Sequence, residues 1–220
     1  MALASGKKRS GRLLGNHQRC WLWGRHLVAE TLAAGRWPIH EIHLADRLDE
    51  DRISTVQNLA ASQSVPVYVE PSKRLTQLAG TKDHQGFLTK MGPFPYTDVA
   101  EVLQADTANP LYLILDSLHD SYNVGAVVRS AEVFGATAVI LGAWGQAEVN
   151  SQVARSSVGA VNRVQLVRAE DLAELIRTLQ RRGVKVYGAS EKGEQAAFSL
   201  DLSGAVGLVI GNEGRGLTPA

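Results

Sequence analysis

The sequence of 220 residues has very little cysteine and no long apolar run. Its single cysteine, Cys20, excludes an intrachain disulfide and is typical of a protein kept in a reducing, intracellular compartment. No cysteines and histidines have the spacing of a metal site, and no apolar stretch approaches the roughly 18–20 residues of a membrane span. We therefore expect a cytoplasmic protein with no metal and no membrane partner.

Nucleotide-binding fingerprints are also missing. No predicted strand is followed by G-x-G-x-x-G with an acidic residue about 20 positions later, which argues against a Rossmann-type dinucleotide enzyme. The run "GNEGRG" over 211–216 is rich in glycine, but no Walker lysine follows it, so a phosphate-cradling loop is unsupported. Glycine there would let backbone N–H groups approach a ligand, although a tight turn without a ligand is the default interpretation.

Charge is nearly balanced overall, at +1, but it is unevenly distributed. Residues 1–20 contain five basic side chains and no acidic one. They lack the apolar core of a secretory signal. We predict a basic flexible tail over 1–20, and two interpretations are open: a solvated tail, or an arm that touches RNA phosphates.

The remaining chain divides into two α/β units. Residues 21–92 mix helical and strand-like patterns, with helices that end at Gly35 and Gly80. Residues 93–110 begin with two prolines and form the predicted linker, which includes a short helix over 98–104.

From residue 111 to residue 220 the pattern alternates strand and helix. "LYLIL" and "AVILG" are continuous apolar runs, which are typical of strands buried on both faces of a parallel sheet. The sequence therefore predicts an α/β fold, a parallel sheet flanked by helices. Ligands of such sheets lie at the carboxyl ends of the strands, which directs attention to "DSLHDSYNVG", "GASEKG" and "GNEGRG".

The segment after "LYLIL" predicts a helix that starts at Val124, with Asn123 as its N-cap. At about 100° per residue, one stripe of this helix faces the sheet. Arg129 lies nearly opposite that stripe. It is either a solvated arginine or one that leans toward the strand ends, where Asn123 and Glu213 could converge. The predicted stripe consists of Val124, Val127, Ala131 and Phe134.

At this point the sequence resembles a known family. "DSLHDSYNVGAVVRSAEVFGATAVIL" and "LVIGNEGRGL" are similar to the first and second signatures of the SpoU (TrmH) class of RNA ribose 2′-O-methyltransferases. "NSQVARSSVGAVNRVQLV" is similar to the stretch that links the first signature to the next helix. "WLWGRHLVAETLAAGRWPIHEIHLA" and "LAGTKDHQGFL" resemble the small RNA-binding domain of the RlmB-like subgroup, which methylates a guanosine of large-subunit ribosomal RNA. The resemblance extends from about Trp21 to Thr218.

The resemblance implies a fold, a cofactor and a partner. It implies a C-terminal trefoil knot, S-adenosylmethionine bound within the knot, a homodimer, and RNA as the substrate. Knots are rare among protein folds, so only the resemblance supports this one. Transfer RNA as the substrate, or a non-catalytic RNA-binding relative, are the alternatives. The family's third signature does not occur before Ala220, so we expect that the natural protein continues and that the knot is incomplete in this chain.

The resemblance also implies roles for individual residues. Asn123 would order the site, Arg129 would bind the phosphate of the target nucleotide and assist loss of the ribose proton, and Glu213 would hold the arginine or its loop. A guanidinium group keeps its proton up to a pH of about 12 in water. Arg129 is therefore either a true base or, more simply, a group that positions the ribose and stabilises its developing alkoxide.

Two further sets of residues follow from the resemblance. The RNA-binding set has a structural alternative, since His84 could satisfy a turn and Arg25 could cap a helix. The implied cofactor-binding residues are Gly188, Ala189, Ser190, Ile210, Gly211, Asn212 and Gly214. The implied RNA-binding residues are Arg25, His26, Lys82, His84 and Gln85.

Overall fold

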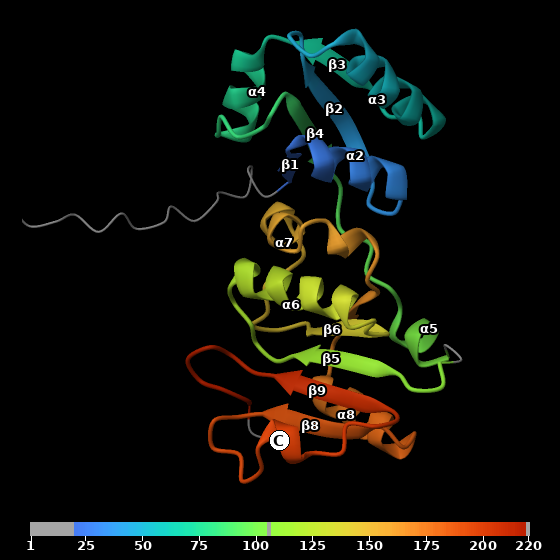
Figure 1. Ribbon diagram of the computed structural model, residues 1–220, viewed down its shortest axis with the longest axis vertical. Helices are drawn as coiled ribbons and strands as arrows, with labels where there is room; N and C mark the ends of the chain where they lie inside the picture. Colours follow the sequence, from blue (N-terminus) through green and yellow to red (C-terminus); the bar gives the residue numbers. More distant parts are fainter. Residues whose placement is uncertain (1–19, 105–106, 219–220) are drawn as a thin grey trace, which may run out of the picture.

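The computed structural model describes residues 20–104 and 107–218, which form two α/β units arranged along the long axis of the molecule (Figure 1). Apart from Cys20, the predicted basic tail lies outside the described residues. Within the described parts of the chain, no helix has both the length and the apolar character needed to cross a bilayer. The same residues contain no cluster of three or more side chains suited to holding a metal ion.

The first unit is a four-stranded mixed sheet with the order β1-β4-β2-β3. β4 pairs antiparallel with both β1 and β2, and β2 pairs parallel with β3. Helices cover both faces, and the predicted helix ends at Gly35 and Gly80 are confirmed. The strand β1 was not predicted from the sequence. The elements are β1 Trp21–Trp23, α2 Arg25–Ala34, β2 Ile39–Ala45, α3 Glu50–Ser62, β3 Val67–Glu70, α4 Ser72–Ala79 and β4 Phe87–Met91.

The second unit is a five-stranded parallel sheet with the order β7-β6-β5-β9-β8. This confirms the predicted parallel sheet flanked by helices. The chain runs from β5 outward to β7 on one side and then crosses to β8 and β9 on the other. The elements are α5 Val99–Gln104, β5 Leu111–Leu115, α6 Ser121–Val133, β6 Ala138–Gly142, α7 Ser151–Ser156, η1 Ala160–Asn162, β7 Leu166–Ala169, α8 Leu172–Arg181, β8 Lys185–Ala189, η2 Ala197–Ser199 and β9 Val206–Ile210.

The sheet of the second unit separates two apolar cores. Leu113 and Leu115 of β5 pack in the core beneath α6 and α7, whereas Tyr112 and Ile114 pack in the core beneath α5 and α8. Because successive strand side chains point to opposite faces, a strand buried on both sides must be apolar throughout. This is why the uninterrupted apolar run predicted the strand correctly.

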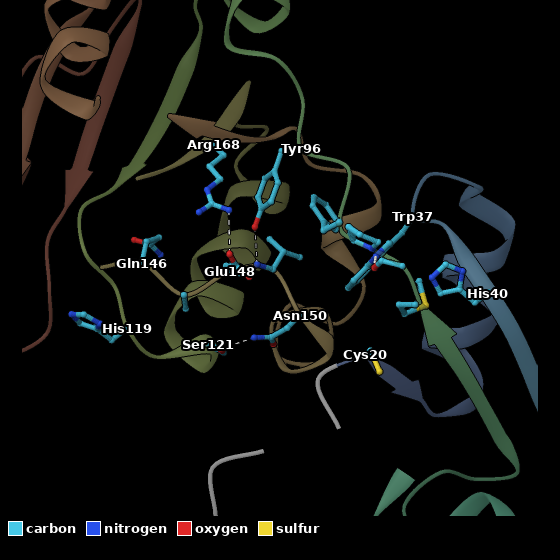
Figure 2. Close-up of a pocket in the computed structure, with 16 residues that line it drawn as sticks. Cys20, Trp37, His40, Tyr96, His119, Ser121, Gln146, Glu148, Asn150 and Arg168 are labelled. Carbon is cyan, nitrogen blue, oxygen red and sulfur yellow. Dashed lines mark hydrogen bonds and ion pairs between the residues drawn. The ribbon is translucent and has the colours of Figure 1, made fainter. Parts of the chain in front are cut away.

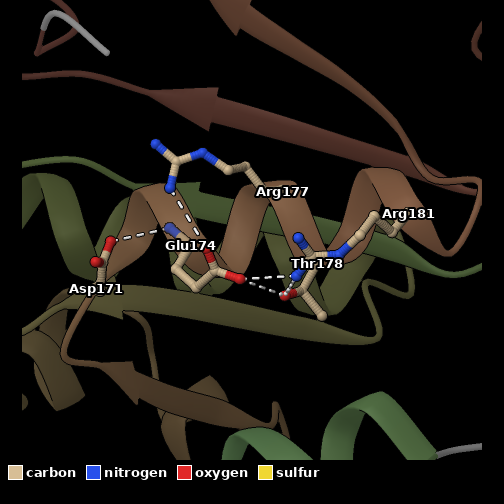
Figure 3. A network of polar contacts seen from close by, with 5 residues as sticks. All are labelled: Asp171, Glu174, Arg177, Thr178 and Arg181. Atoms are coloured by element: carbon tan, nitrogen blue, oxygen red, sulfur yellow. Dashed lines mark hydrogen bonds and ion pairs between the residues drawn. The ribbon is translucent and has the colours of Figure 1, made fainter.

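Helix α8 shows how local sequence fixes an element on the outer surface (Figure 3). The Asp171 side chain caps the helix by accepting a hydrogen bond from the Glu174 backbone N–H group, at 2.9 Å. Glu174 in turn accepts hydrogen bonds from Arg181 and Arg177, at 2.7 Å and 3.4 Å. Hydrogen bonding to Arg181, and then its charge, lowers the pKa of the Glu174 carboxyl, with Arg177 adding to the effect.

Helix α6 differs from the prediction in its start and its buried face. It begins at Ser121, and its N-cap is Asp120, whose side chain accepts from the Tyr122 N–H group at 2.8 Å. The predicted cap, Asn123, therefore lies inside the first turn. Phe134 follows the last helical residue, in the connection to β6, and is 75% exposed. The fully buried stripe consists of Val124, Val128 and Ala131, with Val127 only partly buried.

Helices α6 and α7 approach each other very closely. An added Cβ atom at Gly125 would stand 2.8 Å from the Val153 carbonyl oxygen and 2.8 Å from the Ser156 Cβ atom. Side chains larger than glycine are therefore excluded at this crossing. The Ser156 hydroxyl also donates to the Ser121 carbonyl oxygen, at 3.3 Å, which ties α7 to the start of α6.

The two units are joined by a set of contacts around α7 and η1, which we call the interdomain clamp. Buried Asn162 donates from Nδ2 to the Thr31 hydroxyl at 3.0 Å, and Arg36 donates to the Val164 carbonyl oxygen at 2.6 Å. Arg163 forms ion pairs with Glu30 of α2 and Glu132 of α6. The Arg155 guanidinium lies over the Trp23 ring, 4.2 Å from its centroid.

Candidate active site

The turn over 116–123 follows β5. After β5 the chain builds the sheet on one side, with β6 and β7, and it later adds β9 and β8 on the other side, so β5 and β9 flank the point where the strand order reverses. The crevice at such a point is the usual ligand site of open parallel sheets. The Asp116 N–H group donates to the Ile210 carbonyl oxygen at 2.9 Å, and the Leu118 N–H group donates to Gln146 Oε1 at 3.0 Å. These bonds fix the turn to the end of β9 on one side and to the segment after β6 on the other.

The loop over 211–217 closes on itself at the end of β9. Asn212 and Gly216 exchange two backbone hydrogen bonds, each of 2.9 Å. An added Cβ atom at Gly211 would stand 2.6 Å from the Leu217 backbone nitrogen. Glycine is thus required at position 211 so that the loop can pack against its own backbone. The sequence had suggested another reason, namely that glycine lets backbone N–H groups approach a ligand.

Hydrogen bonds between three pairs of residues connect this loop, and Thr218 directly after it, to the turn after β5. Asn123 donates from Nδ2 to Glu213 Oε1 at 2.7 Å, and Asn212 donates from Nδ2 to the Ser117 carbonyl oxygen at 2.8 Å. Thr218 donates to Asp116 through its backbone N–H group, at 2.6 Å, and through its hydroxyl, at 2.9 Å. Two of the three implied catalytic residues, Asn123 and Glu213, are therefore in direct contact.

The pKa of Glu213 lies below its usual value. The hydrogen bond from Asn123 is the largest cause, followed by the hydrogen bond from its own backbone N–H group; the charge of nearby His119 adds a smaller effect. Each of these favours the ionised carboxylate. The contact with Asn123 therefore joins a neutral amide donor to a carboxylate.

The end of β8 completes a cavity of about 460 Å³ next to this loop. Gly188 packs against Leu217, because an added Cβ atom at 188 would stand 2.6 Å from Leu217 Cδ1. The cavity has the size and the mixed apolar and polar lining of a small-molecule site, so the residues present fit a nucleoside. The lining residues are Asp116, Leu172, Ala173, Ile176, Arg177, Gln180, Gly188, Val209, Leu217 and Thr218.

The other implied cofactor residues lie around the same strand ends. Ala189 and Ser190 are exposed at the end of β8, and Ile210 lies half-buried at the end of β9. The Gly214 N–H group donates to the Asn212 side chain at 3.0 Å, inside the loop. The strand ends named in the sequence therefore gather at one edge of the sheet.

Arg129 does not join this group. It lies on the exposed side of α6, and it makes no hydrogen bond or ion pair with any described residue. It lines neither the cavity beside Leu217 nor the cleft between the two units. The guanidinium group is therefore free to pair with a phosphate or with a second chain.

The implied RNA-binding residues divide into exposed and buried ones. The side chains of Arg25, His26, Lys82 and Gln85 are exposed. The Gln85 side chain accepts from the Arg25 backbone N–H group at 3.1 Å, so Gln85 caps α2. His26 and Gln85 line a cavity of about 250 Å³ near the interdomain clamp.

His84 is the exception in this set, because it is 1% exposed. Its Nδ1 atom accepts from the Gly86 N–H group at 3.1 Å, and its Nε2 atom contacts the Thr76 hydroxyl at 3.0 Å. Burial, and then the charge of Arg47, lower the pKa of the imidazole. The structure favours the alternative that His84 satisfies a turn, since both ring nitrogens are occupied within the first unit.

A second cavity, which we call the interdomain cleft, was not predicted from the sequence. It has a volume of about 770 Å³ and lies between the two units (Figure 2). Its walls come from segments as far apart as residues 20 and 168, so no local pattern marks it. The lining residues are Cys20, Trp37, His40, Met91, Gly92, Pro93, Phe94, Tyr96, His119, Ser121, Gln146, Ala147, Glu148, Val149, Asn150 and Arg168.

Comparison with known proteins gives matches for both units. Residues 110–220 match the model of the SpoU rRNA Methylase family, and residues 21–97 match the model described as RNA 2'-O ribose methyltransferase substrate binding. The 23S rRNA (guanosine-2'-O-)-methyltransferase RlmB of Xanthomonas campestris pv. campestris is 31% identical over 91% of this chain and 82% of its own length.

Two further proteins extend the comparison. The putative TrmH family tRNA/rRNA methyltransferase YacO of Bacillus subtilis is 27% identical over 92% of this chain and 82% of its own length. The SpoU methyltransferase AviRb from Streptomyces viridochromogenes, solved in complex with the cofactor AdoMet, superimposes with a TM-score of 0.76 at 19% identity, covering 90% of this chain and 75% of that one. At that identity the likeness to AviRb shows a shared fold.

Proposed function

Because the chain belongs to the SpoU rRNA methylase family, we propose that it transfers a methyl group from S-adenosylmethionine to a ribose 2′-hydroxyl group of RNA. The observation that carries the proposal is the 2.7 Å hydrogen bond between Asn123 and Glu213. It joins the turn after β5 to the loop after β9, at the edge of the sheet where ligands of this architecture bind. Two residues implied by different signatures therefore meet at one place.

The cofactor cavity of the proposal is the one beside Leu217. Of the seven implied cofactor residues, Gly188 lines this cavity. The other six lie outside its lining, at the neighbouring ends of β8 and β9, and would contact the part of the cofactor that extends beyond the cavity. They are Ala189, Ser190, Ile210, Gly211, Asn212 and Gly214. S-adenosylmethionine supplies a methyl group on a sulfonium centre, which is electrophilic without further activation. The apolar side chains of the cavity would exclude water from that group.

The protein's part in the reaction is alignment and charge stabilisation. Asn123 and Glu213 would hold the turn after β5 and the loop after β9 in fixed positions relative to each other, so that a ribose oxygen lies in line with the methyl group. We assign Arg129 the role of pairing with the phosphate of the target nucleotide. From there its charge would stabilise the ribose oxygen as the hydroxyl proton passes to water and the O–C bond forms, with the S–C bond broken and S-adenosylhomocysteine as the leaving group.

The proposed substrate is a guanosine of large-subunit ribosomal RNA. Support comes from the similarity to RlmB over both units. In this proposal residues 21–92 bind the RNA, residues 93–110 link the units, and residues 111–220 carry out the transfer. The exposed residues Arg25, His26, Lys82 and Gln85 are candidate contacts. Transfer RNA is the alternative substrate, since YacO is named as a tRNA/rRNA methyltransferase.

Three further parts of the proposal follow from the resemblance. A homodimer would give the exposed Arg129 a second chain to approach. A trefoil knot would be formed by the segment that follows β9. The compartment would be the cytoplasm, in keeping with the use of a single cysteine.

The test is methyl transfer to 23S ribosomal RNA transcribed in vitro, with labelled S-adenosylmethionine and mapping of the modified ribose. Arg129→Ala should lower transfer by about a hundredfold, as loss of an oxyanion-stabilising donor does. Cofactor affinity, measured by calorimetry, should stay unchanged. Arg74→Ala, which removes an exposed arginine from α4 of the first unit, is the matched control and should transfer normally.

Retained turnover in Arg129→Ala would refute the assigned role. A wild-type protein that binds the RNA but transfers no methyl group would instead favour the non-catalytic RNA-binding relative. Transfer to transfer RNA, with none to 23S ribosomal RNA, would select the alternative substrate.

A further inference from the structure

The interdomain cleft shares a wall with the candidate active site. Within the turn over 116–123, Asp116 lines the cavity beside Leu217, whereas His119 and Ser121 line the cleft. Asn123 follows two residues after Ser121 and forms the hydrogen bond to Glu213. An RNA strand whose ribose is held at Asn123 can therefore pass directly from the active site into the cleft.

The cleft offers free polar groups suited to a nucleotide. His40 and His119 are exposed, and neither forms a hydrogen bond with a described residue. Gln146 also lines the cleft, but its Oε1 atom accepts from Leu118 and its Nε2 atom is buried, so the two histidines are the exposed polar groups of this argument. Hydrogen-bonding groups of this kind read the edges and phosphates of unpaired RNA bases.

The floor and the charge of the cleft also suit an RNA strand. Trp37, Phe94 and Tyr96 form successive edge-to-face contacts, with centroid distances of 5.0 Å and 5.2 Å. Among the described lining residues Glu148 alone is acidic, and Arg168 donates to it at 3.1 Å. A neutralised carboxylate leaves little repulsion toward a phosphate. Trp37 and Phe94 are only 4% and 8% exposed, so these rings form a rigid apolar wall of the cleft.

The walls of the cleft are fixed relative to each other. The Val149 N–H group donates to the Tyr96 hydroxyl at 2.9 Å, which joins the linker to the second unit. Trp37 donates from Nε1 to the Gly92 carbonyl oxygen at 2.8 Å, which holds the opposite wall. The interdomain clamp fixes the same two units from the side of α7. A site built in advance loses less entropy when a ligand binds.

From these observations we propose that the interdomain cleft binds an unpaired nucleotide of the RNA, adjacent to the nucleotide that is methylated. The inference rests on the proposed function, because it takes RNA as the substrate. The cleft volume of about 770 Å³ lies within the range of small-molecule sites, which admits one nucleotide and excludes a duplex. The enzyme would then select targets in loops, where the neighbouring base is free to turn outward.

Photo-crosslinking tests where the strand lies. The probe is a short single-stranded RNA of mixed sequence that contains 4-thiouridine, and a duplex of the same sequence is the comparison. Crosslinked peptides from the single strand should include residues 37–40, 91–96 or 119–121, and the duplex should crosslink weakly there. Crosslinks confined to other surfaces, or equal crosslinking by the duplex, would overturn the proposal.

Affinity for the same single-stranded RNA, labelled with fluorescein, tests the two free histidines. His40→Ala and His119→Ala should each raise the dissociation constant about tenfold, which corresponds to one lost hydrogen bond to a charged group. Gln57→Ala, on the exposed face of α3 outside the cleft, is the control and should bind normally. Unchanged affinity for the RNA in both histidine variants would contradict the proposal that the cleft binds RNA.

The two proposals fail in different ways. Both readouts measure RNA contact and neither requires methyl transfer. If the wild-type protein transfers methyl groups but crosslinks outside the cleft, the proposed function stands and the inference falls. If the single strand crosslinks to the cleft and no methyl group is transferred, the cleft stands and the proposed function falls.

Discussion

The turn after β5 and the segment after β8 occupy equivalent positions at the edge of one sheet, yet they are built in opposite ways. The turn over 116–123 is bonded to β9, to the loop over 211–217 and to the segment after β6. The segment over 190–205 bonds mainly within itself, and Phe198 in it is 95% exposed. One half of the candidate site is thus tied to several distant segments, whereas the other half is held by short-range bonds and by Lys185 and Tyr187 of the adjacent strand β8.

The largest expected effect comes from breaking the half that is tied to distant segments. Gly211→Ala places a Cβ atom 2.6 Å from the Leu217 backbone nitrogen, so the loop over 211–217 must open. Displacement of a catalytic group by about 1 Å can cost about a hundredfold in rate, and we expect a loss of that size in methyl transfer. Gly214→Ala is the comparison for loop opening, since the nearest atom to its added Cβ is 3.7 Å away. Hydrogen exchange over 211–217 should become faster in Gly211→Ala and stay unchanged in Gly214→Ala, and equally fast exchange in both variants would contradict the assigned packing.

A smaller effect is expected from the helix cap of the same turn. Asp120→Ala should lower the free energy of unfolding by about 1 kcal/mol, and methyl transfer several-fold, because Asn123 lies in the turn that Asp120 caps. Asp49→Ala removes the equivalent cap of α3 in the first unit, remote from Asn123 and from both cavities of the proposal. It should cost similar stability in urea denaturation while leaving transfer unchanged. If both variants lose transfer equally, the cap of α6 has no special role.

The smallest expected effect is a difference in hydrogen exchange between the segment over 190–205 and the turn over 116–123. In hydrogen exchange, amides over 190–195 should exchange fast and those of Leu118 and Val124 slowly, since exposed segments with few bonds open most readily. Saturating S-adenosylmethionine should slow exchange near Gly188 and leave Val124 unchanged. If the cofactor slowed exchange at Val124 but not near Gly188, the turn after β5 would be the half that becomes ordered, contrary to this prediction.

The sheet of the second unit could be predicted because each of its buried strands carries its own signal. "LYLIL" and "AVILG" are apolar at every position, and the structure buries them between two layers of helices. The start of α6 could not be resolved in the same way. Asp120 and Asn123 are both favoured N-cap residues. In the structure Asp120 is the cap, and the Asn123 side chain instead binds Glu213, which lies 90 residues later.

The interdomain cleft and the interdomain clamp carry no local signal. Arg36 reaches a carbonyl oxygen 128 residues away, and Asn162 reaches a hydroxyl 131 residues away. Periodicity in a sequence reports which face of an element is buried, but not which distant element covers it. The same limit explains His84, whose burial depends on Thr76 of α4 and on the turn at Gly86.

The crossing at Gly125 has a mechanical consequence. Side chains usually separate packed helices and absorb small displacements, but here the α6 backbone meets Val153 and Ser156 directly. Arg155, on the same short helix, lies over Trp23 of the first unit. Because the interdomain clamp fixes the first unit to α7, and α7 meets α6 without intervening side chains, the position of the first unit helps to determine where α6 begins. The placement of Asn123 in the first turn of α6 therefore depends on the first unit as well as on the sheet.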